Sequence, residues 1–369
     1  MVLVPCCTKF PNNSISKGKR MIMKRILLLF LLISLLPVFG FSQADLQPAA
    51  TVNLIRTEQI SVRQLRVEVE NNEKTAGRPL TQSERRQVLD VMINERLCLQ
   101  AAERDRVTIT DNEVTQQIQQ YRNAMSQQAG RQITDAEFAQ AIMSQTGMDT
   151  QAFREQLRKQ MIVQKYLQYK KGDLINSVRE PTEEEIMSEY RLARTQFIRP
   201  ETVRFSMIQI PYGSDAASRS RARELADRLN REIGSNTSRF DEVAARSAAP
   251  NSGYQAGDAG FLPRTQDARN VVGQELMNIA FSLRQGQVSS LIEGVQGYQI
   301  IKITENYSEK NLELDDILQL GTRITVREYI IQAMINHRQQ VILNQASEEL
   351  ITELRAGRSF QVFENNLNW

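Results

Sequence analysis

The sequence predicts an α+β protein in which a mainly helical domain contains an inserted α/β domain of antiparallel sheet and short helices. A helical period of apolar residues dominates from about Asp45 to Tyr190 and returns from Leu312 to Leu354. Between these stretches, strand alternation and glycine-rich segments replace it. Because the last helix has no partner of its own after residue 305, its apolar face is expected to pack on the N-terminal helices.

The first 44 residues are typical of a secretory signal with an upstream extension. Lys24 and Arg25 precede an apolar run without charge, residues 26–41, and small residues follow up to Ala44. The run is short for a bilayer span, which needs about 20 apolar residues. We therefore expect export to the periplasm with cleavage near Ala44. An uncleaved signal that anchors the chain to the membrane is the alternative.

Composition excludes several classes of function for the chain from Asp45 onward. Six basic residues and no acidic residue precede this point, which leaves 40 lysines and arginines against 43 acidic residues. This balance gives no support to nucleic-acid binding. No phosphate-binding loop indicates a nucleotide, and the single histidine, His337, cannot by itself form a metal site, so no cofactor is expected. Cys98 is the only cysteine that remains, and its position on an apolar helix predicts a core residue.

Helix starts in the first domain are marked by capping boxes, in which a threonine and a glutamate satisfy two free backbone amides reciprocally. Apolar stripes follow them, for example Leu89, Ile93 and Leu97, or Val114, Ile118 and Tyr121. Asp149 is expected to cap a further helix, and residues 51–55 are expected to form a short strand. The four boxes begin at Thr81, Thr110, Thr134 and Thr182.

The period changes after Pro200. Val203, Phe205 and Met207 alternate as in a strand, and an amphipathic helix and a short helix over residues 240–246 follow. A glycine-rich loop is predicted for residues 251–260, a short helix for 276–283, and paired strands around Val288 and 298–303. Residues 359–363 again show strand alternation. The predicted domains are 1–44, 45–198, 199–306 and 307–369, the last packing on the second.

Several of these segments resemble parvulin-type prolyl isomerase domains. They are Val203–Ile210, Phe240–Ser247, Ala256–Phe261 and Ala280–Ser289, together with Gly297–Lys302, and they occur in the order that the family uses. With the helical part, Gln59 to Pro181, the arrangement is similar to that of SurA-like periplasmic chaperones. The resemblance implies a protein that binds unfolded exported polypeptides, such as outer-membrane proteins, and that carries a proline-recognising domain.

The sequence departs from the parvulin pattern at the positions of its polar centre. The two histidines of the family fall on Met207 and Gln299, and the usual cysteine or aspartate falls near Ala249 or Pro250. Prolyl isomerisation has a barrier of about 18–20 kcal/mol, which a site lowers by holding the twisted amide in an apolar slot. The residues that the resemblance assigns to a peptide-binding pocket are Met207, Ala259, Phe261, Val272, Leu276, Phe281 and Gln299.

The resulting hypothesis is an extracytoplasmic chaperone that binds unfolded polypeptide clients, without nucleotide or nucleic acid, and whose parvulin-like domain is weak or inactive in catalysis. Met207 and Gln299 would then be a core methionine and a surface glutamine in a domain kept for its structure. Two alternatives are an active peptidyl-prolyl cis-trans isomerase and a protein that docks one dedicated partner.

Overall fold

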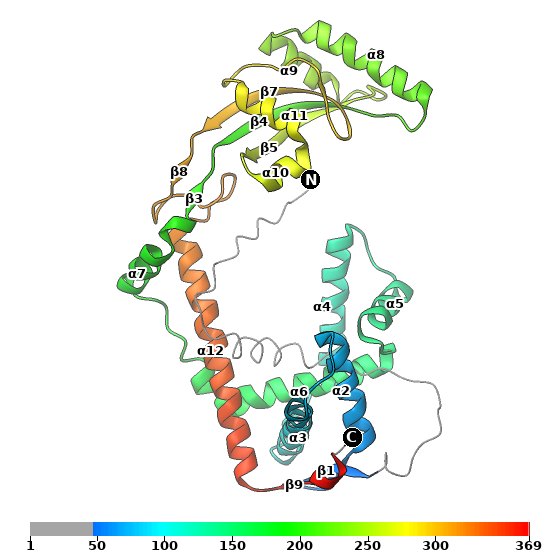
Figure 1. Ribbon diagram of the computed structural model, residues 1–369, viewed down its shortest axis with the longest axis vertical. Helices are drawn as coiled ribbons and strands as arrows, with labels where there is room; N and C mark the ends of the chain where they lie inside the picture. Colours follow the sequence, from blue (N-terminus) through cyan, green and yellow to red (C-terminus); the bar gives the residue numbers. More distant parts are fainter. Residues whose placement is uncertain (1–46, 368) are drawn as a thin grey trace. The chain divides into compact units, whose positions relative to one another are not determined.

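The computed structural model describes residues 47–367 and residue 369, and its contacts divide the chain into two units (Figure 1). The first unit comprises the residues up to Arg179 and those from His337 onward, and the second comprises Glu180–Asn336. The expected signal sequence, residues 1–44, lies outside the described residues. Within the described part of the chain, no helix has the length and apolar character needed to cross a membrane.

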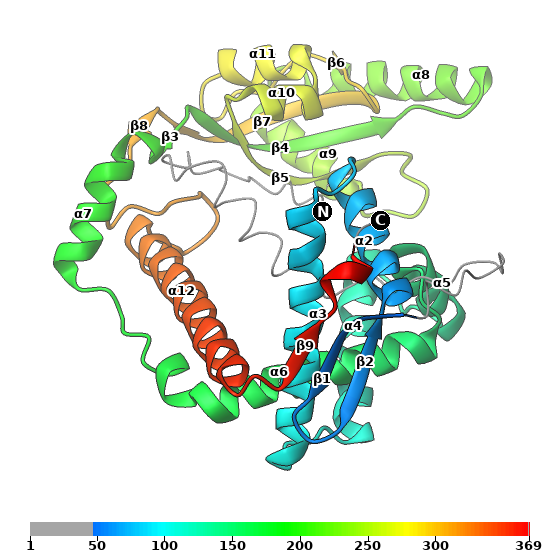
Figure 2. The same cartoon turned by 60° about the horizontal axis from the view of Figure 1, so that its bottom comes forward.

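Unit 1 is built from helices around a small antiparallel sheet of order β2-β1-β9. The predicted strand near residue 51 is β1, and the predicted alternation near residue 360 forms β9, which Figure 2 shows alongside β1. The elements of this unit are β1 (Pro48–Asn53), β2 (Thr57–Ser61), α2 (Val62–Ala76), α3 (Gln82–Arg104), α4 (Asp111–Ala129), α5 (Asp135–Thr146), α6 (Thr150–Ile175), the second part of α12 (Val326–Ala356), β9 (Phe360–Val362) and η3 (Glu364–Asn366).

The predicted helix starts are confirmed by their hydrogen bonds. At each of the four threonines the hydroxyl oxygen accepts from the amide three residues later, and the glutamate there accepts from the threonine amide. Asp149 caps α6, since its carboxylate accepts from the Ala152 amide at 2.7 Å. These local bonds fix where the helices begin before any tertiary contact forms.

The core of unit 1 joins both ends of the described chain. Leu350 and Leu354 of α12 pack in the same buried cluster as Ala50, Val52 and the α3 residues Leu89, Ile93 and Leu97. Cys98 is buried there, and burial raises the pKa of its thiol to about 12, so the predicted core role is confirmed. The expectation that the last helix packs on the N-terminal helices, and with it the predicted fold class, is confirmed.

Polar contacts attach α12 to its neighbours in unit 1. Arg355 donates to Asn94 at 2.7 Å and to Asp90 at 2.7 Å, both on α3. Lys171, where α6 departs from helical backbone angles, donates to Glu349 and Glu353 of α12 at 3.0 and 2.6 Å. The irregular turn of α6 therefore lies at Lys171, the residue whose side chain reaches α12.

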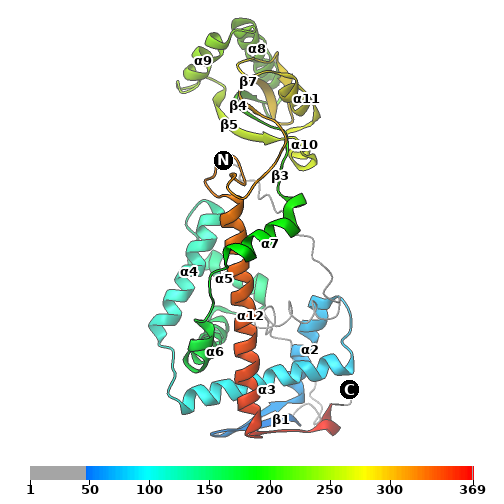
Figure 3. The ribbon, with the colours of Figure 1, turned by 90° about the vertical axis from the view of Figure 1, so that its left-hand side faces the viewer.

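Unit 2 contains a four-stranded antiparallel sheet of order β5-β4-β7-β6 with helices on both faces (Figure 3). One face packs on α8 and α9 and the other on α10 and α11. Its elements are α7 (Glu183–Ala193), η2 (Arg194–Gln196), β3 (Ile198–Arg199), β4 (Thr202–Pro211), α8 (Ala216–Ile233), α9 (Thr237–Arg246), β5 (Gln255–Pro263), α10 (Gln266–Val272), α11 (Gln274–Ser282), β6 (Ile292–Glu293), β7 (Gly297–Tyr307), β8 (Lys310–Asn311) and the first part of α12.

One predicted element of this unit is wrong. The glycine-rich segment expected as a loop over residues 251–260 turns at its start and becomes β5 at Gln255. Pairing with β4 supplies the strand's hydrogen bonds, although glycine and aspartate disfavour strands locally. Tertiary pairing overrides the local preference here.

The contact-defined units also differ from the predicted domain boundaries at residues 198/199 and 306/307. Helix α7 and the start of α12 share a buried cluster that includes Ile186, Phe197 and Ile330. The Phe197 ring stacks on Tyr190 at 6.0 Å and meets Tyr329 edge-on at 6.3 Å. These apolar and aromatic contacts assign residues 180–198 and 307–336 to the same unit as the sheet.

Two helices of unit 1 bring a partly buried carboxyl group next to another acid. Glu68 of α2 faces Glu95 of α3, and burial followed by repulsion from Glu95 raises the pKa of Glu68 to about 7. Because the folded-state pKa is raised, the neutral carboxyl is the form that the fold favours. Its stabilisation is complete below the unfolded value of 4.5 and is lost as the pH rises toward 7.

Replacing Glu68 by glutamine is therefore expected to stabilise the protein mainly at alkaline pH. The free energy of unfolding in urea should rise by about 2–3 kcal/mol at pH 8 and change little at pH 4.5. Glu70→Gln, at an exposed position of the same helix, is the matched control. An equal gain at both pH values would contradict the assignment.

Candidate functional site

The register of the unit 2 sheet decides which of the predicted site residues share a face. Met207 of β4 lies opposite Ile301 of β7, and Gln209 lies opposite Gln299. Directly opposed residues, and alternate residues along one strand, point to the same face of a sheet. Met207 and Gln299 are therefore diagonal neighbours on one face.

Helices α10 and α11 cover part of this face with apolar side chains. Met207, Val272 and Phe281 pack, partly buried, against a buried cluster that contains Leu276. Four of the residues that the sequence assigned to a peptide-binding pocket thus lie together. The buried members of the cluster are Val203, Phe205, Leu262, Leu276, Met277, Ala280, Ile292, Ile301 and Ile303.

A β-bulge separates two other assigned residues from this group. Phe205 pairs with Gly260 and Ser206 with Asp258, so Ala259 is left unpaired, and it is exposed. Phe261 pairs with Arg204 on the opposite face, where its ring lies 6.0 Å from that of Tyr307. The extra residue of the bulge reverses the side to which the glycine-rich strand directs its side chains.

Leu262 takes the place on the apolar face that the sequence assigned to Phe261. It pairs with Val203, is 4% exposed and belongs to the apolar cluster. Simple alternation along residues 255–263 could not reveal it, because the bulge shifts the alternation by one residue. Pro250 is exposed in the turn between α9 and β5 and does not belong to the cluster against which Met207 packs.

Gln299 is the polar group of this face that lies deepest. Its side chain is 8% exposed, and its Oε1 atom is buried without a hydrogen-bond partner. It lies so close to Gly294 that a β-carbon there would be 2.6 Å from Oε1, which explains the glycine. The prediction that Gln299 is a surface residue is therefore wrong, because its side chain is buried. Gln255, Gln209 and Gln299 occupy one register across three strands, so amide groups border the apolar face.

The chemistry available here is limited to apolar packing and neutral hydrogen bonding. A thioether is a weak acceptor, and a glutamine amide donates or accepts without exchanging a proton near neutral pH. Asp258 lies on the bulge, where it accepts from the Gly260 amide at 3.0 Å. Arg204 donates to Asp258 at 2.6 Å and lowers the pKa of that carboxyl.

A second candidate site is the apolar stripe of α4 and α5 in unit 1. Along α4 burial decreases in steps: Val114 is fully buried, Ile118 is half-buried and Tyr121 is 43% exposed. The first turns pack on α6, where Phe153 meets the Tyr121 ring at 6.3 Å. Met143 on α5 is 48% exposed, whereas Met148, which follows the end of that helix, is buried. Unit 1 therefore presents a large aromatic ring and a flexible thioether on adjacent helices.

Two family models match the chain. Residues 13–167 match the model described as the SurA-like N-terminal domain, and residues 206–305 match the PPIC-type PPIASE domain, also called rotamase. The glycine-rich strand, the bulge and the Met207–Gln299 pair all lie inside the second match.

Curated relatives carry the name Chaperone SurA. The protein from Hahella chejuensis is 23% identical over 275 residues, which cover 74% of this chain and 58% of the relative. That from Alcanivorax borkumensis is 28% identical over 295 residues, or 76% and 63% of the two chains. The chain thus spans about three fifths of the length of these relatives.

One solved structure, from work on the SurA-like chaperones PEB4 and Cj1289 of Campylobacter jejuni, is similar at 14% identity and a TM-score of 0.34. The similarity covers 86% of this chain and 98% of the solved chain. The two domain matches follow one another in the order that the sequence predicted. The chain therefore combines a region that matches the SurA-like N-terminal domain with a following region that matches the PPIC-type rotamase domain.

Proposed function

We propose that this protein is a periplasmic chaperone that holds unfolded exported polypeptides, outer-membrane proteins among them, and that its rotamase domain contributes little catalysis. The observation that carries the proposal is the uncovered apolar stripe of α4 and α5, in which Tyr121 and Met143 remain exposed although α4 is amphipathic. The names of the relatives and the two domain matches support the same function.

The stripe suits reversible binding of many different clients. Apolar contact contributes about 25 cal/mol for each Å² removed from water, and it does not depend on direction or sequence. Tyrosine offers a large rigid surface, while methionine adapts to irregular shapes. A client segment held in this way needs no nucleotide for its release. The uncharged run of residues 26–41, preceded by Lys24 and Arg25, supports export, with membrane attachment only if that signal stays uncleaved.

Weak catalysis follows from what occupies the apolar face of the sheet. Isomerisation must overcome about 18–20 kcal/mol, and an apolar slot alone removes only part of this barrier. Met207 supplies apolar contact, and Gln299 supplies one amide that cannot act as an acid or base near neutral pH.

Active isomerisation is the second candidate function, and one observation favours it. The Gln299 Oε1 atom is a buried acceptor without a partner on the face that carries Met207, and it would accept a hydrogen bond from a bound peptide only if the side chain turned toward that peptide. A protein dedicated to one partner remains the third. It would protect a single client from aggregation and leave unrelated clients unprotected.

Polar substitutions in the stripe are expected to weaken client holding. The Tyr121→Ser, Met143→Ser double variant should need about fivefold more protein to halve the aggregation of several unrelated unfolded clients, since about 1 kcal/mol of apolar contact is lost. Light scattering of diluted denatured clients measures this. The control is Val295→Ser, at a valine that is 68% exposed in unit 2. An unchanged double variant would refute the stripe as the binding surface.

Replacing Gln299 by leucine distinguishes a rotamase domain with little catalysis from an active isomerase. Removing a buried oxygen without a partner should raise the free energy of unfolding by about 1 kcal/mol. If the domain contributes little catalysis, the rate of isomerisation of a proline peptide should stay at its already low value. A gain in stability together with a clear loss of turnover would show that Gln299 serves an active isomerase.

A further inference from the structure

The residues that follow α12 lie extended along the edge of β1 and beside a pocket of unit 1, and we call the surface that they cover the groove. We define this segment, residues 359–367 together with Trp369, as the strap. We propose that the groove beneath the strap is a second binding site for an extended client segment with alternating apolar residues and an aromatic residue, and that such a segment displaces the strap. The inference rests on the proposed chaperone function and names a class of client for it.

Main-chain hydrogen bonds hold one part of the strap against the rest of unit 1. Strand β9 pairs antiparallel with β1, with Ala50 opposite Val362 and Val52 opposite Phe360. The Asn53 amide donates to the Ser359 carbonyl at 2.7 Å, and the Phe363 amide donates to the Ala49 carbonyl at 3.0 Å. Bonds of this kind accept any extended chain, because they read the backbone and not the side chains.

Side-chain positions along the groove select apolar and aromatic residues. Phe360 and Val362 of the strap pack on the core cluster, and the Arg355 guanidinium lies 5.0 Å from the Phe360 ring centre. Two guanidinium groups lie over the Trp369 ring, those of Arg66 at 4.8 Å and Arg85 at 5.0 Å from its centre. Two cations close to a ring favour an aromatic residue at this position.

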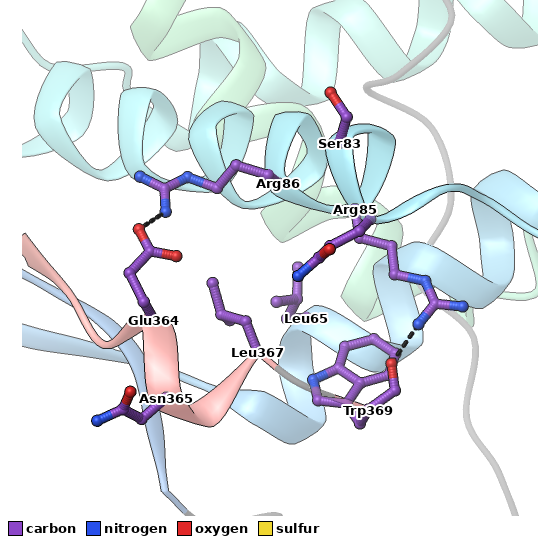
Figure 4. A pocket seen from close by; sticks show the side chains of 9 residues that line it. Leu65, Ser83, Arg85, Arg86, Glu364, Asn365, Leu367 and Trp369 are labelled. Atoms are coloured by element: carbon purple, nitrogen blue, oxygen red, sulfur yellow. Dashed lines mark hydrogen bonds and ion pairs between the residues drawn. The ribbon is translucent and has the colours of Figure 1, made fainter.

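The groove continues into a pocket of about 440 Å³ beside Trp369 (Figure 4). Arg86 forms an ion pair with Glu364 at its edge, and Arg85 donates to the main-chain oxygen of Trp369. The Trp369 Nε1 atom is buried without a partner. The pocket therefore has room beyond the strap and suits an acidic residue near the aromatic one. It is lined by Leu65, Gln82, Ser83, Arg85, Arg86, Glu364, Asn365, Leu367 and Trp369.

The strap is a cover and not part of the core. Every described residue of the strap is half-buried or exposed, whereas Ala49, Ala50 and Val52 beneath it are fully buried. Its strand pairs only three residues and lies at the edge of the sheet. Short edge elements of this kind open at a lower free energy than the core they cover. The strap can therefore leave while the rest of unit 1 stays folded.

The experiment uses the chain ending at Arg358 and a fluorescein-labelled peptide with the sequence of residues 359–369. Circular dichroism and the protection of Cys98 from a thiol reagent report whether the shortened chain is folded. Fluorescence anisotropy should show the peptide binding the shortened chain at least about tenfold more tightly than the full chain. A matched peptide with Phe360→Ser and Trp369→Ser should bind about tenfold more weakly. A folded shortened chain that does not bind the peptide would overturn the inference.

If the shortened chain does not fold, the full chain with Phe360→Ser and Trp369→Ala serves instead. It should bind the peptide more tightly than the unaltered chain, and equal binding would overturn the inference. Aggregation assays separate this outcome from that of the proposed function. If chains with and without the strap protect clients equally and the peptide does not bind, the strap site alone is refuted. Peptide binding without client protection supports the strap site and refutes the chaperone proposal.

Discussion

The packing of α12 on the N-terminal core is the contact on which the architecture of unit 1 depends. It joins segments far apart in the sequence, since Leu350 and Leu354 share a buried cluster with Ala50 and Val52. The free-energy cost of closing a loop rises only logarithmically with its length, so a large insertion is tolerated between the two segments. Burial of Leu350 and Leu354 against the N-terminal core then holds the loop closed. The rotamase domain can be inserted because of this closure.

The central strand β4 has the corresponding role in unit 2. It pairs with both β5 and β7, and its alternation directs Phe205 and Met207 to one face and Ile208 and Ile210 to the other. Arg204 ties the three strands together through Asp258 of β5 and Glu305 of β7, at 2.6 and 2.8 Å. The face with Met207 therefore has a fixed shape, while its polar content is reduced to amides. If the domain binds peptides as proposed, this face offers them apolar contact and amide groups rather than groups that exchange protons near neutral pH.

Three surfaces of the protein share one chemical character. The α4 and α5 stripe, the Met207 face and the groove under the strap all offer apolar or aromatic contact bordered by neutral or cationic polar groups. Under the proposed function, such surfaces would recognise the composition of an unfolded chain and not a particular sequence. Methionine and tyrosine at exposed positions add adaptability to this recognition.

The sequence by itself determined the elements whose cause is local. The threonine–glutamate boxes set the helix starts through bonds that span three residues, and alternation predicted β4, β7 and β9 because their faces differ in burial. It also located Met207 and Gln299, which lie together. Tertiary structure alone decided the rest. Strand β5 exists because β4 pairs with it, and the bulge at Ala259 exchanges Phe261 for Leu262 on the apolar face. The unit boundary follows from the Phe197 cluster and not from the prolines near it. These features depend on contacts between distant residues, which local sequence patterns do not encode.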